Sequence, residues 1–298
     1  MLLRAFAKIN LSLRILGRRP DGYHEVRTVL QTVDWWDEIH MDPAEHFHFW
    51  GPGTPADETN LVIRAVRAYE RLTGVNVRVR IGLIKQIPIG RGLGGGSADA
   101  AVTLMGLQRI YKKTMDASDV LNELQGLGAD VPFFAIGGMA EGFGRGDQVV
   151  RIEDDPRYWL LLVDPGIVVP RAEAYSWLTL PAGSNSIESL QPQCVSAHEP
   201  DKRSECEPDR AKSESDEWRN DFEAPVFERY PELADIKREL VRLGAYRAAL
   251  SGSGSAVFGQ FQTEKEAVQA GSALDQRFRV KVTKPLPRSE YFQRMVEE

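Results

Sequence analysis

The chain has 298 residues, of which 42% are hydrophobic and 27% are charged, and its formal net charge is −6. This composition predicts a globular protein with a sizeable core, most simply in two domains. The negative charge disfavours a nucleic-acid partner, and the sequence shows neither an apolar run of membrane length nor a signal peptide. Two cysteines, Cys194 and Cys206, lie in a polar segment without metal-ligand spacing. We therefore expect a cytoplasmic protein in a reducing compartment, without a membrane partner.

The first predicted element is a strand over residues 4–15, in which apolar and polar side chains alternate. The alternation places Lys8 and Asn10 on one face of this strand, about 7 Å apart. An edge strand with one solvated face explains the same pattern equally well. The spacing alone therefore leaves the role of the two residues open.

A turn-forming segment at 18–22 leads to a second predicted strand, which covers residues 26–33 and ends near Trp36. Tyr23 and His24 follow the turn directly. They are interpreted either as part of a hairpin or as an aromatic platform with a hydrogen-bonding imidazole beside it.

The glycine loop, residues 88–98, is the most distinctive stretch of the sequence. It follows a helix predicted from Thr59 and a strand that ends at Lys85, and it leads into a further predicted helix that begins near Ser97 and Asp99. Its glycines allow positive φ angles and a close approach of backbone N–H groups to a ligand. Because a helix N-terminus attracts anions, we predict a phosphate site here, although a glycine loop without a ligand is the alternative.

The glycine loop also matches two other nucleotide motifs only in part. No lysine precedes Ser97 in the frame of a Walker loop. A GxGxxG pattern at residues 90–95 is followed by Asp116, but this aspartate is interpreted as part of a helix start rather than as a ribose ligand.

An aspartate in an apolar setting follows the next predicted helix, which runs from about Ser118 to Gly128. Asp130 lies between Ala, Val, Pro and Phe residues, where an unpaired carboxylate is costly to bury. We propose Lys8 as its partner, in a pair that can deprotonate a hydroxyl nucleophile. A simple turn or N-cap aspartate is the alternative.

The second half predicts strand, helix, strand, strand, helix and strand, which suggests an α+β sandwich. Tyr175 is expected to begin or cap the first helix. Residues 182–217 are polar and lack periodicity, which is typical of a mobile loop. The segment 248–261 reads as two strands joined by a small-residue turn, where Gly252 and Gly254 permit a close approach.

Together, three segments resemble the motifs of the GHMP small-molecule kinases: AKINL at 7–11, PIGRGLGGGSADAA at 88–101 and LSGSGSAVF at 250–258. Three more are similar to the members that phosphorylate a cytidine diphosphate alcohol: DGYH at 21–24, LGADVPFF at 127–134 and NDFE at 220–223. The resemblance implies an α+β, two-domain GHMP kinase fold. A ribosomal-protein-S5-like domain would cover 1–155, and a ferredoxin-like domain would cover 156–298 and contain a polar insertion at 182–217.

The resemblance also implies a function: ATP-dependent phosphorylation of the 2-hydroxyl of cytidine diphosphate methylerythritol, in non-mevalonate isoprenoid synthesis. Asp130 would draw the proton from this hydroxyl, assisted by Lys8. Mg²⁺ is expected with the nucleotide, and its ligands are not identified. ATP would contact Asn60, Lys85, Pro88, Ile89, Gly90, Arg91, Gly92, Leu93, Gly94, Gly95, Gly96, Ser97 and Ala98. The acceptor would contact Asn10 at its methylerythritol end, Tyr23 and Tyr175 on the cytosine faces, His24 on the polar edge of the base, and Gly252 and Gly254 near the transferred phosphoryl group.

Two positions depart from the family pattern, which usually has small residues there. Arg91 would add a cation to the phosphate site or extend into solvent, and Arg171 would alter contacts near the cytidine.

A kinase of another alcohol, such as mevalonate or homoserine, is one alternative to the predicted function. A nucleotide sensor without catalysis is another, but it has no use for Lys8 beside Asp130.

Overall fold

The computed structural model of the chain describes residues 1–113, 117–179, 218–274 and 276–297. Within these ranges every helix is too short or too polar to cross a lipid bilayer. The predicted insertion 182–217, with Cys194 and Cys206, lies outside the described residues, and so does Asp116.

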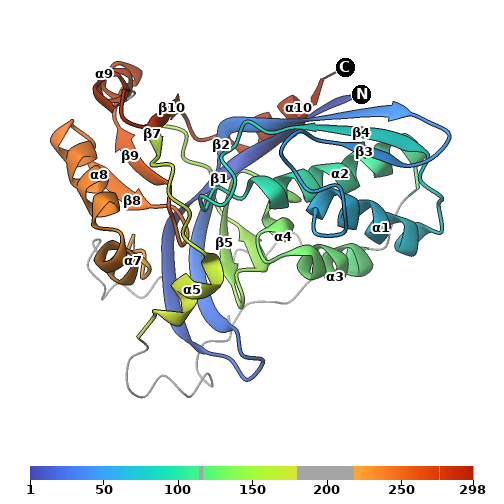
Figure 1. Cartoon of the computed structure of the whole chain (residues 1–298), viewed down its shortest axis with the longest axis horizontal. Helices are drawn as coiled ribbons and strands as arrows, with labels where there is room; N and C mark the ends of the chain where they lie inside the picture. Colours follow the sequence, from blue (N-terminus) through green and yellow to red (C-terminus); the bar gives the residue numbers. More distant parts are fainter. Residues whose placement is uncertain (114–116, 180–217, 275, 298) are drawn as a thin grey trace, which may run out of the picture.

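The first sheet is built around two long antiparallel strands that run side by side through the molecule (Figure 1). Its strand order is β11-β1-β2-β4-β3, and β5 pairs with both β2 and β6. The strands are β1 (Leu2–Arg18), β2 (His24–Pro43), β3 (His48–Trp50), β4 (Val79–Ile84), β5 (Met139–Phe143), β6 (Gln148–Arg151) and β11 (Val296–Glu297).

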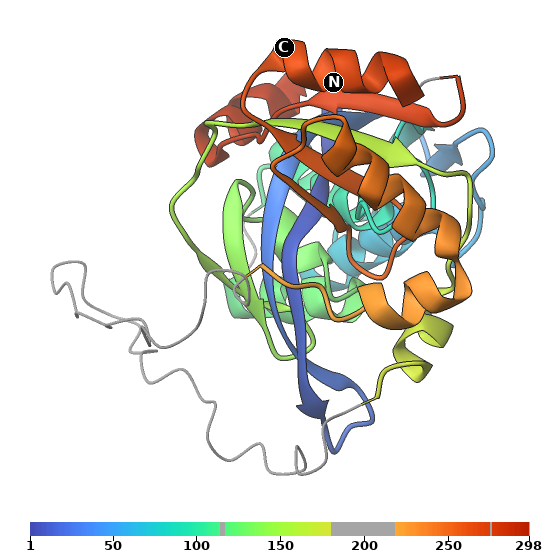
Figure 2. The ribbon, with the colours of Figure 1, turned by 90° about the vertical axis from the view of Figure 1, so that its left-hand side faces the viewer.

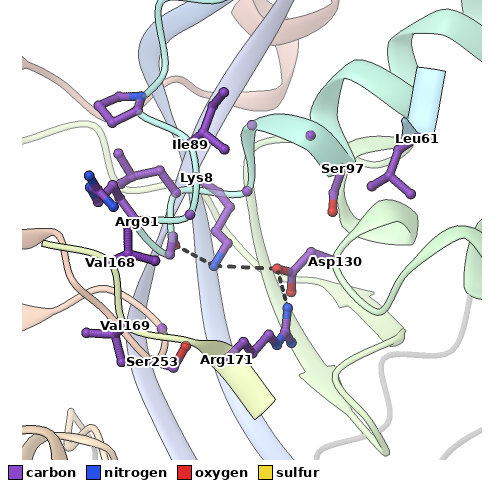
Figure 3. A pocket seen from close by; sticks show the side chains of 18 of the residues that line it. Lys8, Leu61, Ile89, Arg91, Ser97, Asp130, Val168, Val169, Arg171 and Ser253 are labelled. Carbon is purple, nitrogen blue, oxygen red and sulfur yellow. Dashed lines mark hydrogen bonds and ion pairs between the residues drawn. The ribbon is translucent and has the colours of Figure 1, made fainter. Parts of the chain in front are cut away.

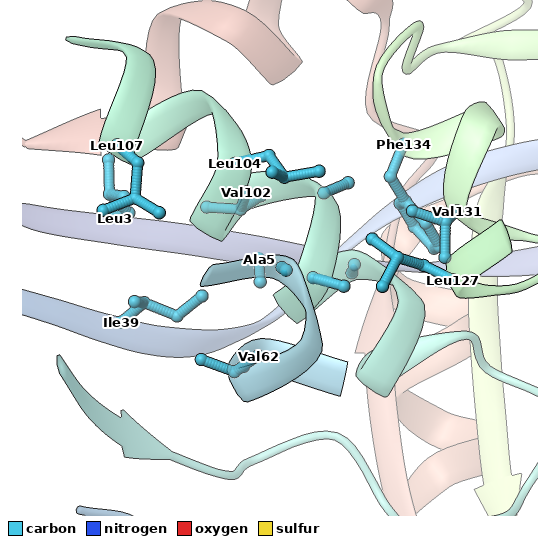
Figure 4. Packing of buried hydrophobic residues seen from close by; sticks show 14 of the residues in the cluster. Leu3, Ala5, Ile39, Val62, Val102, Leu104, Leu107, Leu127, Val131 and Phe134 are labelled. Atoms are coloured by element: carbon cyan, nitrogen blue, oxygen red, sulfur yellow. The ribbon is translucent and has the colours of Figure 1, made fainter. Parts of the chain in front are cut away.

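The helices of this first part are α1 (Leu61–Thr73), α2 (Gly95–Tyr111), α3 (Ala117–Leu127), α4 (Val131–Phe134) and α10 (Arg288–Met295). Side chains of α2 such as Leu104 and Leu107 pack toward Leu3 of β1 and Ile39 of β2 (Figure 4). Residues 98–104 of α2 are all buried, because α1 and α4 also pack against this helix. Burial on several sides explains why its sequence is apolar without a clear polar stripe.

The second sheet has the strand order β10-β7-β9-β8, and its pairs are antiparallel. Its elements are β7 (Trp159–Asp164), α5 (Arg171–Ser176), α7 (Glu223–Arg229), α8 (Pro231–Arg242), β8 (Arg247–Leu250), β9 (Val257–Phe261), α9 (Glu264–Leu274) and β10 (Arg279–Thr283). The helices α8 and α9 lie together on one face of this sheet (Figure 2). The strand and helix order confirms the ferredoxin-like prediction, and the two sheets with their helices confirm the α+β fold class.

Strand β1 contributes to each of three buried apolar clusters, one after another along its length. Leu3 and Ala5 belong to the cluster of the first sheet and its helices, and Leu13 belongs to the cluster of the second part. Between them, Ile9 and Leu11 pack with side chains of both sheets. Both faces of β1 are therefore buried, and the alternative of an edge strand with one solvated face is wrong.

Two local predictions need correction. Trp36 does not end a strand: β2 continues to Pro43, and a bulge at this point lets Trp36 pair with Phe6 while Val33 pairs with Ala7. Tyr175 lies in the last turn of α5 rather than at its start.

The C-terminal elements α10 and β11 had no counterpart in the prediction. They return to the first sheet, where Leu3 of β1 pairs with Val296 of β11. The division into residues 1–155 and 156–298 stays a proposal. By its pairing with β1, the segment that contains α10 and β11 belongs to the same sheet as the proposed first domain.

Tyr291 of α10 provides a test of how this return segment contributes to stability. Its hydroxyl is buried and donates a hydrogen bond of 2.6 Å to the carbonyl of Phe134. In Tyr291→Phe this carbonyl is left without its partner, so we expect unfolding free energy to fall by about 1–3 kcal/mol in a denaturant titration. Tyr246→Phe is the control, because Tyr246 is half-exposed, and it should change stability by less than about 0.5 kcal/mol. Equal stability of the two variants would contradict this assignment.

Candidate active site

A cavity of about 500 Å³ lies where the two sheets meet, and most of the predicted site residues line it (Figure 3). The predicted residues that line it are Lys8, Asn10, Asn60, Lys85, Asp130, Tyr175, Gly252, Gly254 and every residue from Pro88 to Ser97. Ala98, Tyr23 and His24 are not among the described residues on the cavity wall. Ala98 is fully buried behind the glycine loop in the first turn of α2.

The glycine loop ends in the N-terminus of α2, which begins two residues before Ser97. Gly94 occupies the N-cap position with a φ of 72°, and it offers no side-chain cap to the first turn. The backbone N–H groups at the start of the helix are therefore available to a ligand, and the helix dipole favours an anion there. Asp99 does not cap the helix, because its carboxylate pairs with Lys85.

Gly92 brings the glycine loop against both sheets. Its carbonyl accepts hydrogen bonds from Lys8 Nζ at 2.9 Å and from Ser251 Oγ at 3.0 Å. Its φ is 76°, and a Cβ built on it would lie 2.1 Å from the carbonyl oxygen of Ser251. Only glycine fits this conformation and this approach.

Lys8 is buried in the centre of the site. Its ammonium group donates to Asn10 Oδ1 at 2.5 Å and lies 3.8 Å from Asp130 Oδ2. Burial lowers the pKa of Lys8, although the charge of Asp130 opposes this effect. The expected neighbours Lys8, Asn10 and Asp130 thus lie together, while their roles stay predictions.

Asp130 lies at the N-cap position of the short helix α4 but makes no cap hydrogen bond with its side chain. Its carboxylate instead faces the cavity, where Arg171 Nη1 lies 3.4 Å from Oδ2, the same oxygen that faces Lys8. Burial alone would raise the pKa of Asp130, but the charges of Lys8 and Arg171 outweigh burial and hold it below its usual value. The carboxylate is therefore ionised at neutral pH.

Lys85 is engaged by two carboxylates at the base of the glycine loop. Its ammonium group pairs with Asp37 and, at 2.7 Å, with Asp99 Oδ2. Burial raises the pKa of Asp99 to about 8, with Lys85 opposing this and Asp37 adding to it. A Cβ on Gly95 would lie 3.0 Å from Lys85 Nζ, so this cluster supports the loop from behind. Its charge is balanced inside the protein, rather than unpaired at the mouth of the loop.

Arg91 does not extend into solvent, so that expectation was wrong, while its expected role as a cation of the phosphate site stays a prediction. Its guanidinium pairs with Asp164 at the end of β7 at 2.8 Å, and both side chains are mostly buried. The carbonyl of Arg91 accepts the N–H of Ala256 at 3.1 Å. The residue therefore connects the glycine loop to the second sheet.

Aromatic side chains gather at the other end of the site. The rings of His24 and Tyr175 have centroids 5.2 Å apart, and Phe222 lies 4.8 Å from Tyr175 in an edge-on arrangement. Burial, with a smaller effect of Arg18, lowers the pKa of His24, so its imidazole is neutral at pH 7 and can both donate and accept hydrogen bonds. Tyr23 is 56% exposed.

The remaining predicted residues are held by backbone contacts. Asn60 caps α1, since its Oδ1 accepts the N–H of Val62 at 2.9 Å. The turn that contains Gly252 is held by Asn220, whose Nδ2 donates to the carbonyls of Leu250 and Gly252, both at 2.8 Å.

Comparison with known proteins agrees with this geometry. The family pattern "GHMP kinases N terminal domain" matches residues 60–138, and "GHMP kinases C terminal" matches residues 208–280. A 4-diphosphocytidyl-2-C-methyl-D-erythritol kinase of Prosthecochloris aestuarii is 38% identical over 288 residues, which cover 94% of this chain and 96% of that protein.

The chain belongs to the 4-diphosphocytidyl-2-C-methyl-D-erythritol kinase family of GHMP kinases.

Solved structures agree with this membership. A crystal structure of 4-(cytidine 5'-diphospho)-2C-methyl-D-erythritol kinase is similar with a TM-score of 0.76 and 32% identity, covering 95% of this chain and 98% of that one. A homoserine kinase from Cytophaga hutchinsonii has a TM-score of 0.67 and 16% identity, covering 97% of this chain and 95% of that one. At 16% identity, the similarity to the homoserine kinase shows a shared fold and nothing more. The chain is thus a small-molecule kinase with the GHMP fold.

Sequence reasoning missed several residues of this kinase cavity. Thr54, Pro55, Val168 and Val169 all line it. Thr54 and Pro55 lie in a polar, turn-rich region without periodicity, and the two valines lie in an apolar run beside a strand. Neither pattern distinguishes a cavity wall from an ordinary loop or a buried segment.

Two glycines of the loop offer a matched test of the Gly92 contact. Gly90 and Gly92 have nearly equal φ angles, 73° and 76°, so alanine carries a similar backbone cost at both positions, about 1–2 kcal/mol. A Cβ on Gly90 would meet Val168 Cγ1 at an ordinary 4.0 Å, whereas Gly92 leaves no room. We expect Gly92→Ala to lower the melting temperature further than Gly90→Ala and to weaken ATP binding at least tenfold relative to it, measured by calorimetry. Indistinguishable variants would contradict the described contact.

Proposed function

We propose that this GHMP kinase transfers the γ-phosphoryl group of ATP to the 2-hydroxyl of 4-diphosphocytidyl-2-C-methyl-D-erythritol, in the non-mevalonate route to isoprenoids. The observation that carries the proposal is the Asp130–Lys8 pair, 3.8 Å apart, in the same cavity as the open N-terminus of α2. The family membership and the acceptor named in its relatives support the substrate. We further propose that the reaction takes place in the cytoplasm and that nucleic acid is not a partner, in line with a net charge of −6.

ATP would lie with its triphosphate along the glycine loop. The first N–H groups of α2, at Gly95, Gly96 and Ser97, would donate to phosphate oxygens, and the helix dipole would favour their charge. Asn60 and Lys85 would lie on the nucleotide side of the cavity, which both residues line. Because both side chains are already hydrogen-bonded within the protein, we expect them to shape this side and to contact the nucleotide through atoms not used internally.

Mg²⁺ would arrive with the nucleotide. Among the described residues no group of three acidic, histidine or cysteine side chains could hold a metal ion. The Ser97 hydroxyl on the cavity wall is an oxygen group of the kind that Mg²⁺ accepts, with phosphates and water as its other ligands. When bound, the ion would neutralise phosphate charge.

The chemical step would use the ionised carboxylate of Asp130. It would accept the proton of the 2-hydroxyl as the hydroxyl oxygen bonds to the γ-phosphorus, while the bond to the β-phosphate oxygen breaks and ADP leaves. The low pKa of Asp130 keeps this group ready to accept a hydrogen bond before reaction. Lys8, held by Asn10 and the carbonyl of Gly92, would fix the orientation of the carboxylate and balance its charge.

The acceptor would span the cavity from Asn10 to the aromatic side chains. Asn10 would contact the methylerythritol end, since it lies next to Lys8. The neutral imidazole of His24 would hydrogen-bond the polar edge of cytosine, with Tyr175 on one face of the base and Tyr23 on the other. Gly252 and Gly254 would form the floor near the transferred phosphoryl group.

Asp130→Asn tests the assignment of the base. The amide keeps the shape of the side chain but cannot take up the proton, so we expect kcat to fall by about 10²–10⁴-fold with ATP affinity unchanged. Coupled ADP release measures the rate, and calorimetry with a non-hydrolysable ATP analogue measures binding. Asp155→Asn is the control, because Asp155 pairs with Arg157 and is not on the wall of the cavity. A near-parental kcat in Asp130→Asn would reject the assignment.

A panel of acceptors tests the substrate. With ATP held constant, we expect the cytidine acceptor to give kcat/KM values at least 10³-fold above those for mevalonate and homoserine, because neither alcohol can use the aromatic end of the cavity. A higher value with either smaller alcohol would favour another kinase of the same family. ATP binding without ADP release on any of the three would favour a nucleotide sensor.

A further inference from the structure

Around Asp130 the cavity carries one basic side chain more than the carboxylate there can balance. Four basic side chains line it in the described part of the chain: Lys8, Lys85, Arg91 and Arg171. Lys85 is matched by two carboxylates and Arg91 by Asp164. Lys8 and Arg171, in contrast, share a single carboxylate, and they approach the same oxygen of it. This excess positive charge suits an anionic ligand.

Arg171 is the more accessible of these two cations. Its side chain is 55% exposed, whereas that of Lys8 is 3% exposed. The guanidinium lies 5.8 Å from the centre of the Tyr175 ring and uses one nitrogen, Nη1, toward Asp130 at 3.4 Å. A guanidinium has five N–H donors in a planar fork that matches phosphate oxygens, so this long contact leaves donors for a ligand.

The position of Arg171 relative to the two substrates narrows the choice of ligand. Arg171 is the first residue of α5, the helix that follows β7. It approaches Asp130 from the side opposite the glycine loop (Figure 3). In the proposed function the acceptor hydroxyl bonds to the γ-phosphorus while Asp130 takes its proton. A donor that touches Asp130 Oδ2 is therefore also next to the phosphoryl group in transfer.

We propose that Arg171 is a further catalytic residue, which donates to the equatorial oxygens of the phosphoryl group as it passes from ATP to the acceptor. The inference rests on the proposed function, and it adds a role to a residue that the family resemblance leaves without one. Arg171 forms no bond in the step and takes no proton. It stabilises the charge that the transferring group carries between its two oxygen partners.

Kinetics of Arg171→Met test this inference with both substrates varied. Loss of contacts that form mainly during transfer lowers kcat and leaves substrate binding unchanged, so we expect kcat to fall by about 10²–10³-fold while both KM values stay within about threefold. Arg242→Met is the matched control, because Arg242 is exposed on α8 and pairs with Glu239, and it should match the parent. A parental kcat in Arg171→Met overturns the inference. A raised KM for the acceptor with unchanged kcat also overturns it, since Arg171 would then hold the acceptor's diphosphate.

The pH profile separates direct contact from an effect through Asp130. Arg171 helps to lower the pKa of Asp130, so its removal raises that pKa and moves the acid limb of kcat to higher pH. If this were its whole role, Arg171→Met would regain the parental kcat on the plateau above that limb, and the inference would fail. We expect the plateau itself to stay low.

A second variant distinguishes loss of the guanidinium group from misfolding of the protein. In Arg171→Gly, added guanidinium ion should raise kcat at least tenfold, whereas added sodium at equal ionic strength should not. Equal effects of the two ions would contradict the inference. The parent enzyme distinguishes this outcome from failure of the proposed function. If the parent acts on mevalonate or homoserine instead of the cytidine acceptor, the acceptor assignment fails, and the Arg171 comparison is made with that alcohol.

Discussion

The carbonyl oxygen of Gly92 is the atom on which the arrangement of the site most depends. It accepts from Lys8 of the first sheet and from Ser251 next to the second sheet, at 2.9 and 3.0 Å. One backbone group thus fixes the glycine loop, the buried ammonium and the turn after β8 relative to one another. The contact requires a residue without a side chain and with positive φ. The ion pair of Arg91 with Asp164 adds a second link between the loop and the second sheet.

Burial of Lys8 and Asp130 is the energetic cost of this geometry. The pKa of Lys8 is lowered by burial, which means that the protein disfavours its charge. Asp130, with two cations beside one oxygen, stays ionised despite burial. A buried ion pair contributes little net stability, because desolvation offsets its attraction. We therefore attribute the pair to the proposed function, in which a desolvated carboxylate would meet a hydroxyl and fixed charges would face a phosphoryl group.

Much of this molecule could be predicted from local patterns. The alternation in β1 places Lys8 and Asn10 on one side, and the glycine loop leads directly into a long helix. The family motifs extended these patterns to a two-sheet fold. What could not be predicted depends on pairings distant in sequence: β11 with β1, or Arg91 with Asp164, since no local signal marks a partner 73 residues away. The same holds for Arg171, whose position beside Asp130 follows only from the packing of the two sheets.

The central claim is that one cavity holds the γ-phosphate of ATP at the N-terminus of α2 and the acceptor hydroxyl at Asp130. A crystal structure of the complex with a non-hydrolysable ATP analogue and the cytidine acceptor tests it most directly. The account predicts the 2-hydroxyl within about 3.2 Å of an Asp130 carboxylate oxygen, in line with the γ-phosphorus. A hydroxyl bound away from Asp130, or a triphosphate bound away from the glycine loop, would contradict it.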